Sequence, residues 1–119
     1  MDDSHDTLDM LEIYLFKEYI IHTAQNGFEG LSRAQTLMPS CIITDIMMPV
    51  MDGIKFFNSL RSREDTAKIP VIAVTAFLKP VTTKSLLNMG FADVITKPFK
   101  LAGIQKTVRA VIERSQESA

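Results

Sequence analysis

Short apolar runs rich in β-branched residues alternate along the chain with longer segments whose apolar positions recur every three to four residues. The short runs are "YIIHTA" at 19–24, "CIITD" at 41–45, "PVIAVT" at 70–75 and "ADVIT" at 92–96. Continuous apolar strands that alternate with amphipathic helices are typical of a parallel sheet covered on both faces. The pattern therefore predicts a doubly wound α/β fold in which each short run is a strand.

The longer segments predict five helices, and turn or capping residues stand at several of their expected ends. These residues are Ser4, Asn26-Gly27, Asp52-Gly53, Pro80 and Gly90. Proline is favoured at the first position of a helix, and glycine is favoured just after the last. We therefore expect one helix to begin at Pro80 and to end before Gly90.

The predicted order begins with a helix, although a parallel fold of this kind is expected to begin with a strand. Only Met1 precedes the acid pair Asp2 and Asp3, which stand just before the first helix. A central strand that is absent leaves buried backbone groups unpaired on both sides of its place. The sequence therefore predicts a fold whose first strand is missing, with a tendency to homodimerise or to exchange a strand.

Composition restricts the classes of protein to which the chain can belong. Its 119 residues are 46% hydrophobic and 23% charged with a net charge of −1, which fits one globular domain without an affinity for nucleic acid or anionic membranes. The single cysteine excludes an internal disulfide and fits the cytoplasm. We expect the domain to span residues 1–114, with 115–119 as a polar tail or the start of a linker.

Polar residues gather where the predicted strands end. Asp45 ends one run, Thr75 ends the next, and Lys97 follows the last, while Asp2 and Asp3 would follow the missing strand. Ligands of open parallel sheets bind beyond the carboxyl ends of the strands. Three carboxylates, a hydroxyl and an ammonium are therefore expected at one edge of the sheet.

This set of groups suits phosphoryl transfer. Clustered carboxylates favour a hard divalent cation, and Mg²⁺ suits them best when phosphate oxygens complete its shell. A lysine and a threonine can pair with phosphoryl oxygens. A carboxylate can itself be the nucleophile and form an aspartyl-phosphate.

Four motifs in order, "DD", "TDIMMPVMDG", "VTA" and "TKPF", resemble the receiver domains of two-component response regulators, the CheY-like family. The resemblance covers nearly the whole chain and implies a flavodoxin-like fold with a central first strand. It also implies a signalling domain that takes phosphate from a histidine kinase or a phosphotransfer protein. The implied phosphoacceptor is Asp45, assisted by Thr75 and Lys97. The implied Mg²⁺ ligands are Asp2, Asp3, Asp45 and the backbone carbonyl of Met47.

The chain departs from the family pattern at several positions. Val94 stands where the family usually has a tyrosine or phenylalanine, which couples phosphorylation to a change in the binding surface. Met47 and Phe77 place bulky apolar groups where the family guides the hydrolytic water.

Two alternative functions remain open at this stage. One is a structural or dimerisation receiver that is not phosphorylated, which the missing strand favours. The other is a Mg²⁺-dependent phosphohydrolase with an aspartyl nucleophile. Haloacid-dehalogenase-type enzymes, however, place a second aspartate where this chain has Met47.

Overall fold

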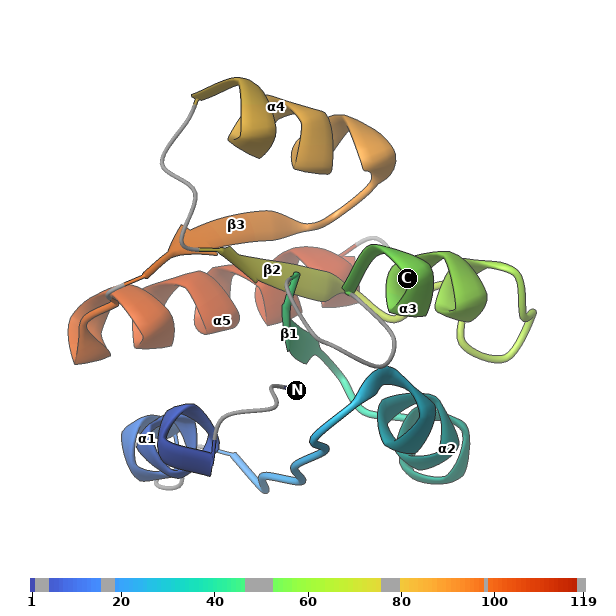
Figure 1. The fold of residues 1–119 in the computed structure, drawn as a ribbon, viewed down its shortest axis with the longest axis horizontal. Helices are drawn as coiled ribbons and strands as arrows, with labels where there is room; N and C mark the ends of the chain where they lie inside the picture. Colours follow the sequence, from blue (N-terminus) through green and yellow to red (C-terminus); the bar gives the residue numbers. More distant parts are fainter. Residues whose placement is uncertain (2–4, 16–18, 47–52, 76–79, 98, 118–119) are drawn as a thin grey trace.

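The computed structural model describes the chain except for residues 2–4, 16–18, 47–52, 76–79, 98 and 118–119. Five helices and three strands form in the described part (Figure 1). In chain order they are α1 (His5–Leu15), α2 (Gly27–Leu37), β1 (Ile42–Asp45), α3 (Gly53–Arg61), β2 (Val71–Thr75), α4 (Pro80–Met89), β3 (Asp93–Thr96) and α5 (Leu101–Glu117). The last helix continues past residue 114, into the segment that the sequence assigned to a tail or linker.

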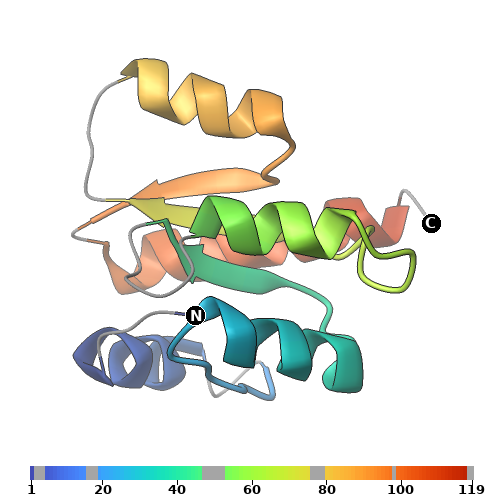
Figure 2. The ribbon, with the colours of Figure 1, turned by 45° about the vertical axis from the view of Figure 1, so that its right-hand side comes forward.

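The described strands form a parallel sheet in the order β1-β2-β3 (Figure 2). β2 is the middle strand, and all five of its residues are buried. Its pairing places Asp45 opposite Val74 and Thr75 opposite Thr96. The carboxyl ends of the three strands therefore meet at one edge, as the sequence predicted.

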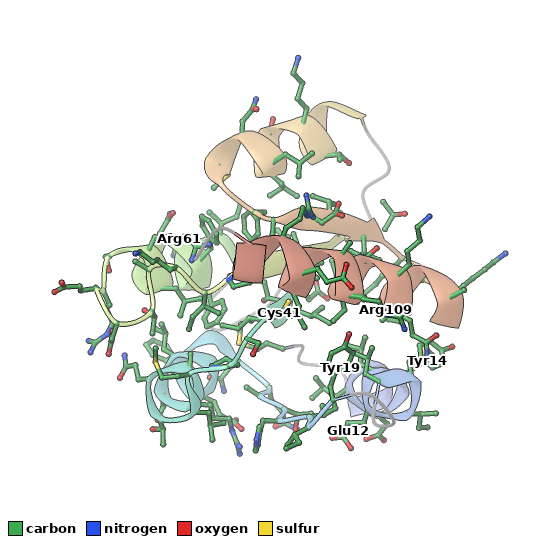
Figure 3. All side chains as sticks on the ribbon, turned by 180° about the vertical axis from the view of Figure 1, so that it is seen from behind. Glu12, Tyr14, Tyr19, Cys41, Arg61 and Arg109 are labelled. Atoms are coloured by element: carbon green, nitrogen blue, oxygen red, sulfur yellow. The ribbon has the colours of Figure 1, made fainter. Side chains whose placement is uncertain are left out.

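Helices cover both faces of the sheet, which confirms the predicted α/β architecture. The first core cluster joins α2, α3 and α4 to one face, and the second joins α1 and α5 to the other. Successive residues of β2 alternate between the clusters, because Val71 and Ala73 belong to the first and Ile72 to the second. Tyr14 of α1 (Figure 3) makes an edge-to-face contact with Phe99, with ring centroids 6.4 Å apart, which adds to the packing on the α1 side.

The helix boundaries follow the turn chemistry of the sequence. Asn26 caps α2, because its side-chain oxygen accepts the Glu29 N–H at 2.9 Å. α4 begins at Pro80, and Gly90 follows its last residue with a φ of 116°, a conformation that favours glycine. Both predicted ends of this helix are thus confirmed, whereas Ser4 lies outside the described residues.

The predicted strand at 19–24 does not form, so this part of the prediction is wrong. The segment is described but has no strand pairing, and no backbone hydrogen bond joins residues 20–24 to β1. A strand requires a partner for its N–H and C=O groups. Among the described residues, Met1 forms the backbone hydrogen bonds on the side of β1 that faces away from β2. A single residue does not provide the row of N–H and C=O groups with which residues 19–24 could pair.

No helix in the described ranges combines the length and the apolar character that a membrane crossing requires.

Cys41 lies just before β1 and is only partly exposed (Figure 3). Burial raises the pKa of its thiol from 9.0 to about 12. The thiol therefore stays protonated near neutral pH and is a poor nucleophile.

Alkylation of Cys41 by iodoacetamide at pH 8 should be slower in the folded protein than in urea by a factor on the order of a thousand, because the thiolate fraction falls with the rise in pKa. The stability that comes from keeping this thiol neutral is complete below pH 9 and is lost as the pH rises toward 12. Mass spectrometry over time measures both alkylation rates, with the unfolded chain as the control. Equal rates in the two states would show that the thiol is not shielded.

Candidate functional site

The polar residues predicted at the strand ends lie together at one edge of the sheet. Asp45 is the last residue of β1, Thr75 is the last residue of β2, and Lys97 directly follows β3. The Lys97 N–H donates to the Thr75 carbonyl at 2.8 Å, which extends the ladder between β2 and β3 beyond the last strand residue. Backbone pairing therefore fixes the positions from which all three side chains project.

The side chains of Lys97 and Asp45 form a salt bridge across this edge. Lys97 Nζ lies 2.8 Å from Asp45 Oδ2, although the residues are 52 positions apart in sequence. The carboxylate is 10% exposed and the lysine side chain 29%. This charge-assisted hydrogen bond is shielded on the carboxylate side but still open to solvent at the lysine. A partly buried carboxylate beside an ammonium is a suitable acceptor for an incoming phosphoryl group.

Two buried threonines lie at or next to the carboxyl ends of β1 and β2. Thr75 is 1% exposed, and Thr44, the residue before Asp45, is fully buried. The Thr44 hydroxyl donates to the Asp45 carbonyl at 3.0 Å. The backbone around Asp45 is therefore held from within β1 as well as by the sheet.

Met1 also contacts the site, a role that sequence reasoning missed. The Asp45 N–H donates to the Met1 carbonyl at 2.9 Å. In the sequence, Met1 stands out only as the residue before the acid pair. No sequence signal indicated this contact, because which N–H groups of β1 face away from β2 depends on the register of the two strands.

Gly53 makes a close approach to the backbone of Asp45. Its N–H donates to the Ile46 carbonyl at 3.0 Å. A Cβ atom added to Gly53 would lie 2.5 Å from the Asp45 carbonyl oxygen and 2.9 Å from the Ile46 Cα. The sequence indicated only a turn at Asp52-Gly53, so the contact with the site was not anticipated.

Several predicted site residues lie outside the described ranges, namely Asp2, Asp3 and Met47, as does Phe77. The structure thus brings Asp45, Thr75 and Lys97 together. It does not test the other predicted Mg²⁺ ligands, which are Asp2, Asp3 and Met47. Within the described ranges, no three histidine, cysteine, aspartate or glutamate side chains gather closely enough to hold a metal ion.

Comparisons with known proteins agree with this geometry. The family model of the response regulator receiver domain matches residues 1–109. The alkaline phosphatase synthesis transcriptional regulatory protein PhoP of Bacillus subtilis (strain 168) is 31% identical over 120 residues, which are 100% of this chain and 49% of PhoP. Hybrid signal transduction histidine kinase D of Dictyostelium discoideum is 33% identical over 99 residues, which are 83% of this chain and 6% of the kinase.

A solved structure of the Vibrio cholerae chemotaxis protein CheY4 has the same fold. It superposes with a TM-score of 0.85 at 30% identity and covers 92% of both chains. This chain spans about half the length of PhoP, so PhoP contains a large part that has no counterpart here.

Replacing Gly53 by alanine should destabilise the protein by on the order of 1–3 kcal/mol, because the new methyl group meets backbone rather than a movable side chain. Gly103→Ala is the matched control, since nothing lies within 4 Å of its added Cβ and the residue is within α5. The control should stabilise by about 0.5–1 kcal/mol. Urea unfolding measures both changes, and a neutral Gly53→Ala would show that the backbone near Asp45 yields easily.

Proposed function

The chain belongs to the response regulator receiver domain family, and we propose that it is a phosphoacceptor signalling domain whose acceptor is Asp45. The observation that carries this proposal is the 2.8 Å contact between Lys97 Nζ and Asp45 Oδ2 at the edge where the parallel strands end. This contact places the shielded Asp45 carboxylate, a possible nucleophile, beside the Lys97 ammonium, a cation that can pair with phosphoryl oxygens.

In this proposal a carboxylate oxygen of Asp45 attacks the phosphorus of a phosphohistidine on the donor protein. The new O–P bond forms as the P–N bond to the histidine breaks, and the freed imidazole takes a proton from solvent. Lys97 moves from the carboxylate to a phosphoryl oxygen, and the Thr75 hydroxyl donates to another. The charges and donors are already fixed at the strand ends, so little rearrangement opposes the transfer.

The proposed metal ligands are Asp2, Asp3, Asp45 and the backbone carbonyl of Met47. The described structure supports this set through Met1, since the residue bonded to the Asp45 N–H directly precedes the acid pair in the sequence. Carboxylate and carbonyl oxygens are the ligands that Mg²⁺ prefers. When bound, Mg²⁺ would supply positive charge against the phosphoryl oxygens.

The proposed donors are a histidine kinase or a phosphotransfer protein, and the proposed location is the cytoplasm. The domain is a signalling module whose own chemistry is limited to gaining and losing its phosphoryl group. Val94 is partly buried and packs against the first core cluster. Because it has no ring, its side chain cannot provide the aromatic reorientation that the family resemblance implies at this position, so the binding surface must respond through other groups.

Asp45→Asn should abolish labelling by radioactive acetyl phosphate in the presence of Mg²⁺, because an amide is nearly isosteric with the carboxylate but is a poor nucleophile. Asp93→Asn is the control, since Asp93 begins β3 and lies at the opposite edge of the sheet. Its labelling should equal that of the wild type. Full labelling of Asp45→Asn would show that another residue is the acceptor. A wild-type protein that takes no label would instead favour the unphosphorylated, structural alternative.

Lys97→Gln should slow labelling by on the order of a hundredfold, because the cation paired with the developing charge is lost. The same change should tighten Mg²⁺ binding, since an ammonium next to Asp45 no longer opposes the metal ion. Lys100→Gln, an exposed change close in sequence, should alter neither property. Labelling kinetics and Mg²⁺ titration measure the two effects. Unchanged kinetics would remove Lys97 from the mechanism.

A further inference from the structure

Lys97 can serve the site only while its ammonium stays close to Asp45. A lysine side chain has many rotamers, and holding it in a single one costs conformational entropy. Removing the carboxylate from water offsets much of the attraction between the two charges. The 2.8 Å contact between Lys97 Nζ and Asp45 Oδ2 therefore depends on a backbone that holds Lys97 in place.

The sheet holds the backbone of Lys97 on its amino side. β3 ends at Thr96, and the Lys97 N–H adds one further bond, to the Thr75 carbonyl at 2.8 Å. Beyond Lys97 the chain leaves the sheet and enters α5 at Leu101. Phe99 lies in this connection, and its side chain packs against the second core cluster. The place where Phe99 packs thus sets the direction in which the chain leaves Lys97.

Tyr14 of α1 (Figure 3) holds the ring of Phe99 from the neighbouring helix. The two ring centroids are 6.4 Å apart and the ring planes meet at 79°, which is the edge-to-face arrangement that aromatic pairs favour. Both side chains are partly buried and pack against the second core cluster. The pair therefore joins α1 to the connection that follows Lys97.

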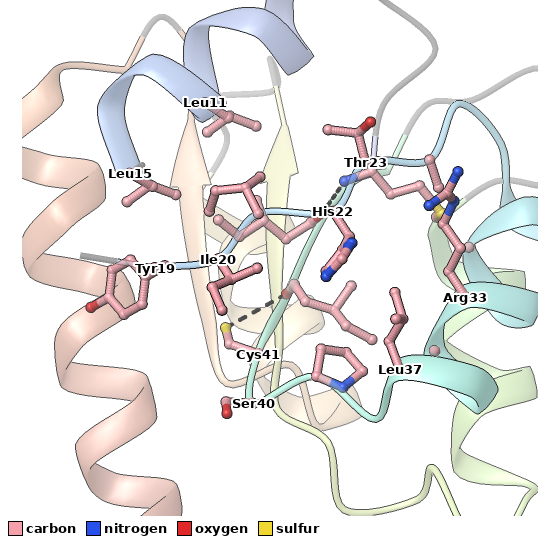
Figure 4. Close-up of a pocket in the computed structure, with 18 of the residues that line it drawn as sticks. Leu11, Leu15, Tyr19, Ile20, His22, Thr23, Arg33, Leu37, Ser40 and Cys41 are labelled. Carbon is pink, nitrogen blue, oxygen red and sulfur yellow. Dashed lines mark hydrogen bonds between the residues drawn. The ribbon is translucent and has the colours of Figure 1, made fainter. Parts of the chain in front are cut away.

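Tyr14 is itself fixed by contacts between α1 and α5. The Gln105 side chain, in α5, donates from Nε2 to the Tyr14 carbonyl at 3.1 Å. Leu11 and Leu15 of α1 line a cavity together with Val108 of α5 (Figure 4) and belong to the same core cluster. The Tyr14 ring is thus a fixed support, because the backbone that carries it is held by a hydrogen bond and by apolar packing.

We propose that Tyr14 is a positioning residue for Lys97. Its ring holds Phe99, and Phe99 fixes the course of the chain after Lys97, so that the ammonium stays at Asp45 until it moves to a phosphoryl oxygen. A reacting group is most effective when packing holds it close to its productive geometry. The inference rests on the proposed function, because it gives Tyr14 a part in the same transfer. Tyr14 acts only through Lys97 and is not a catalytic residue.

Two substitutions of Tyr14 separate the ring from the rest of the side chain. Tyr14→Leu removes the ring but keeps an apolar residue that suits a helix, whereas Tyr14→Phe keeps the ring. Labelling by acetyl phosphate with Mg²⁺ should slow by roughly tenfold in Tyr14→Leu, because Lys97 is no longer held in place. It should keep the wild-type rate in Tyr14→Phe. A wild-type rate in Tyr14→Leu would show that the ring only contributes packing.

A second aromatic pair provides a control for loss of stability. Phe91 stacks on Phe57 with ring centroids 4.1 Å apart, and it precedes β3 rather than following it. Phe91→Leu should lower Tm by about 5 °C and leave the labelling rate unchanged. Slowing by Phe91→Leu as large as that by Tyr14→Leu would show that loss of any aromatic contact impairs the site.

Combining Tyr14→Leu with Lys97→Gln tests whether Tyr14 acts through Lys97. The effects of two residues that act through the same group do not add. In the Lys97→Gln protein, Tyr14→Leu should therefore cause no further slowing of labelling. A further tenfold loss would show that Tyr14 influences the site by another route, and would overturn the proposal.

The last measurement does not depend on phosphorylation. Nitrogen-15 NMR of the unphosphorylated protein follows the exchange of the Lys97 ammonium protons with solvent, and Asp45→Asn gives the value without the salt bridge. Tyr14→Leu should lose most of the protection that Asp45→Asn loses, whereas Tyr14→Phe should keep it. Full protection in Tyr14→Leu would overturn the proposal. Lost protection in a protein that takes no label would support the positioning of Lys97 by Tyr14 and reject only the proposed function.

Discussion

The parallel pairing of β2 with strands on both sides is the constraint from which the other features follow. β2 is buried along its whole length. Its hydrogen-bond register with β1 and β3 sets where the carboxyl ends of those two strands lie relative to each other. That register brings Asp45 and Lys97 to the same edge, although they are 52 residues apart. Their salt bridge is thus a consequence of the sheet. Removing the carboxylate from water offsets much of the Coulomb energy of such a partly buried pair, so its value lies in chemistry.

The same sheet also explains why residues 19–24 form no strand. β1 is fully paired on one side, but on the other side it bonds only to Met1 among the described residues. Residues 20–24 have strand-forming composition and still form no strand, because β propensity acts only where a neighbouring strand accepts the hydrogen bonds. Met1 therefore contacts both the middle of β1, at Ile43, and its carboxyl end, at Asp45.

Close backbone packing joins Gly53, the first residue of α3, to Asp45, the proposed phosphoacceptor. Gly53 lies against the carbonyl of Asp45, where no side chain fits. The Thr44 hydroxyl donates to the same carbonyl. A nucleophile is most effective when its own backbone is fixed before the reaction, and this arrangement fixes Asp45 without adding charges to the site.

Hydrophobic periodicity and turn residues by themselves determined the order of the five helices and of the three strands that form, the covering of both faces of the sheet by helices, and the edge at which Asp45, Thr75 and Lys97 meet. They could do so because periodicity, helix caps and strand ends are local properties of the chain. Only the tertiary structure decided the fate of residues 19–24, the pairing of Met1 and the contact of Gly53 with Asp45. Each of these depends on which backbone lies alongside another, and a strand-like sequence does not specify whether its partner is present.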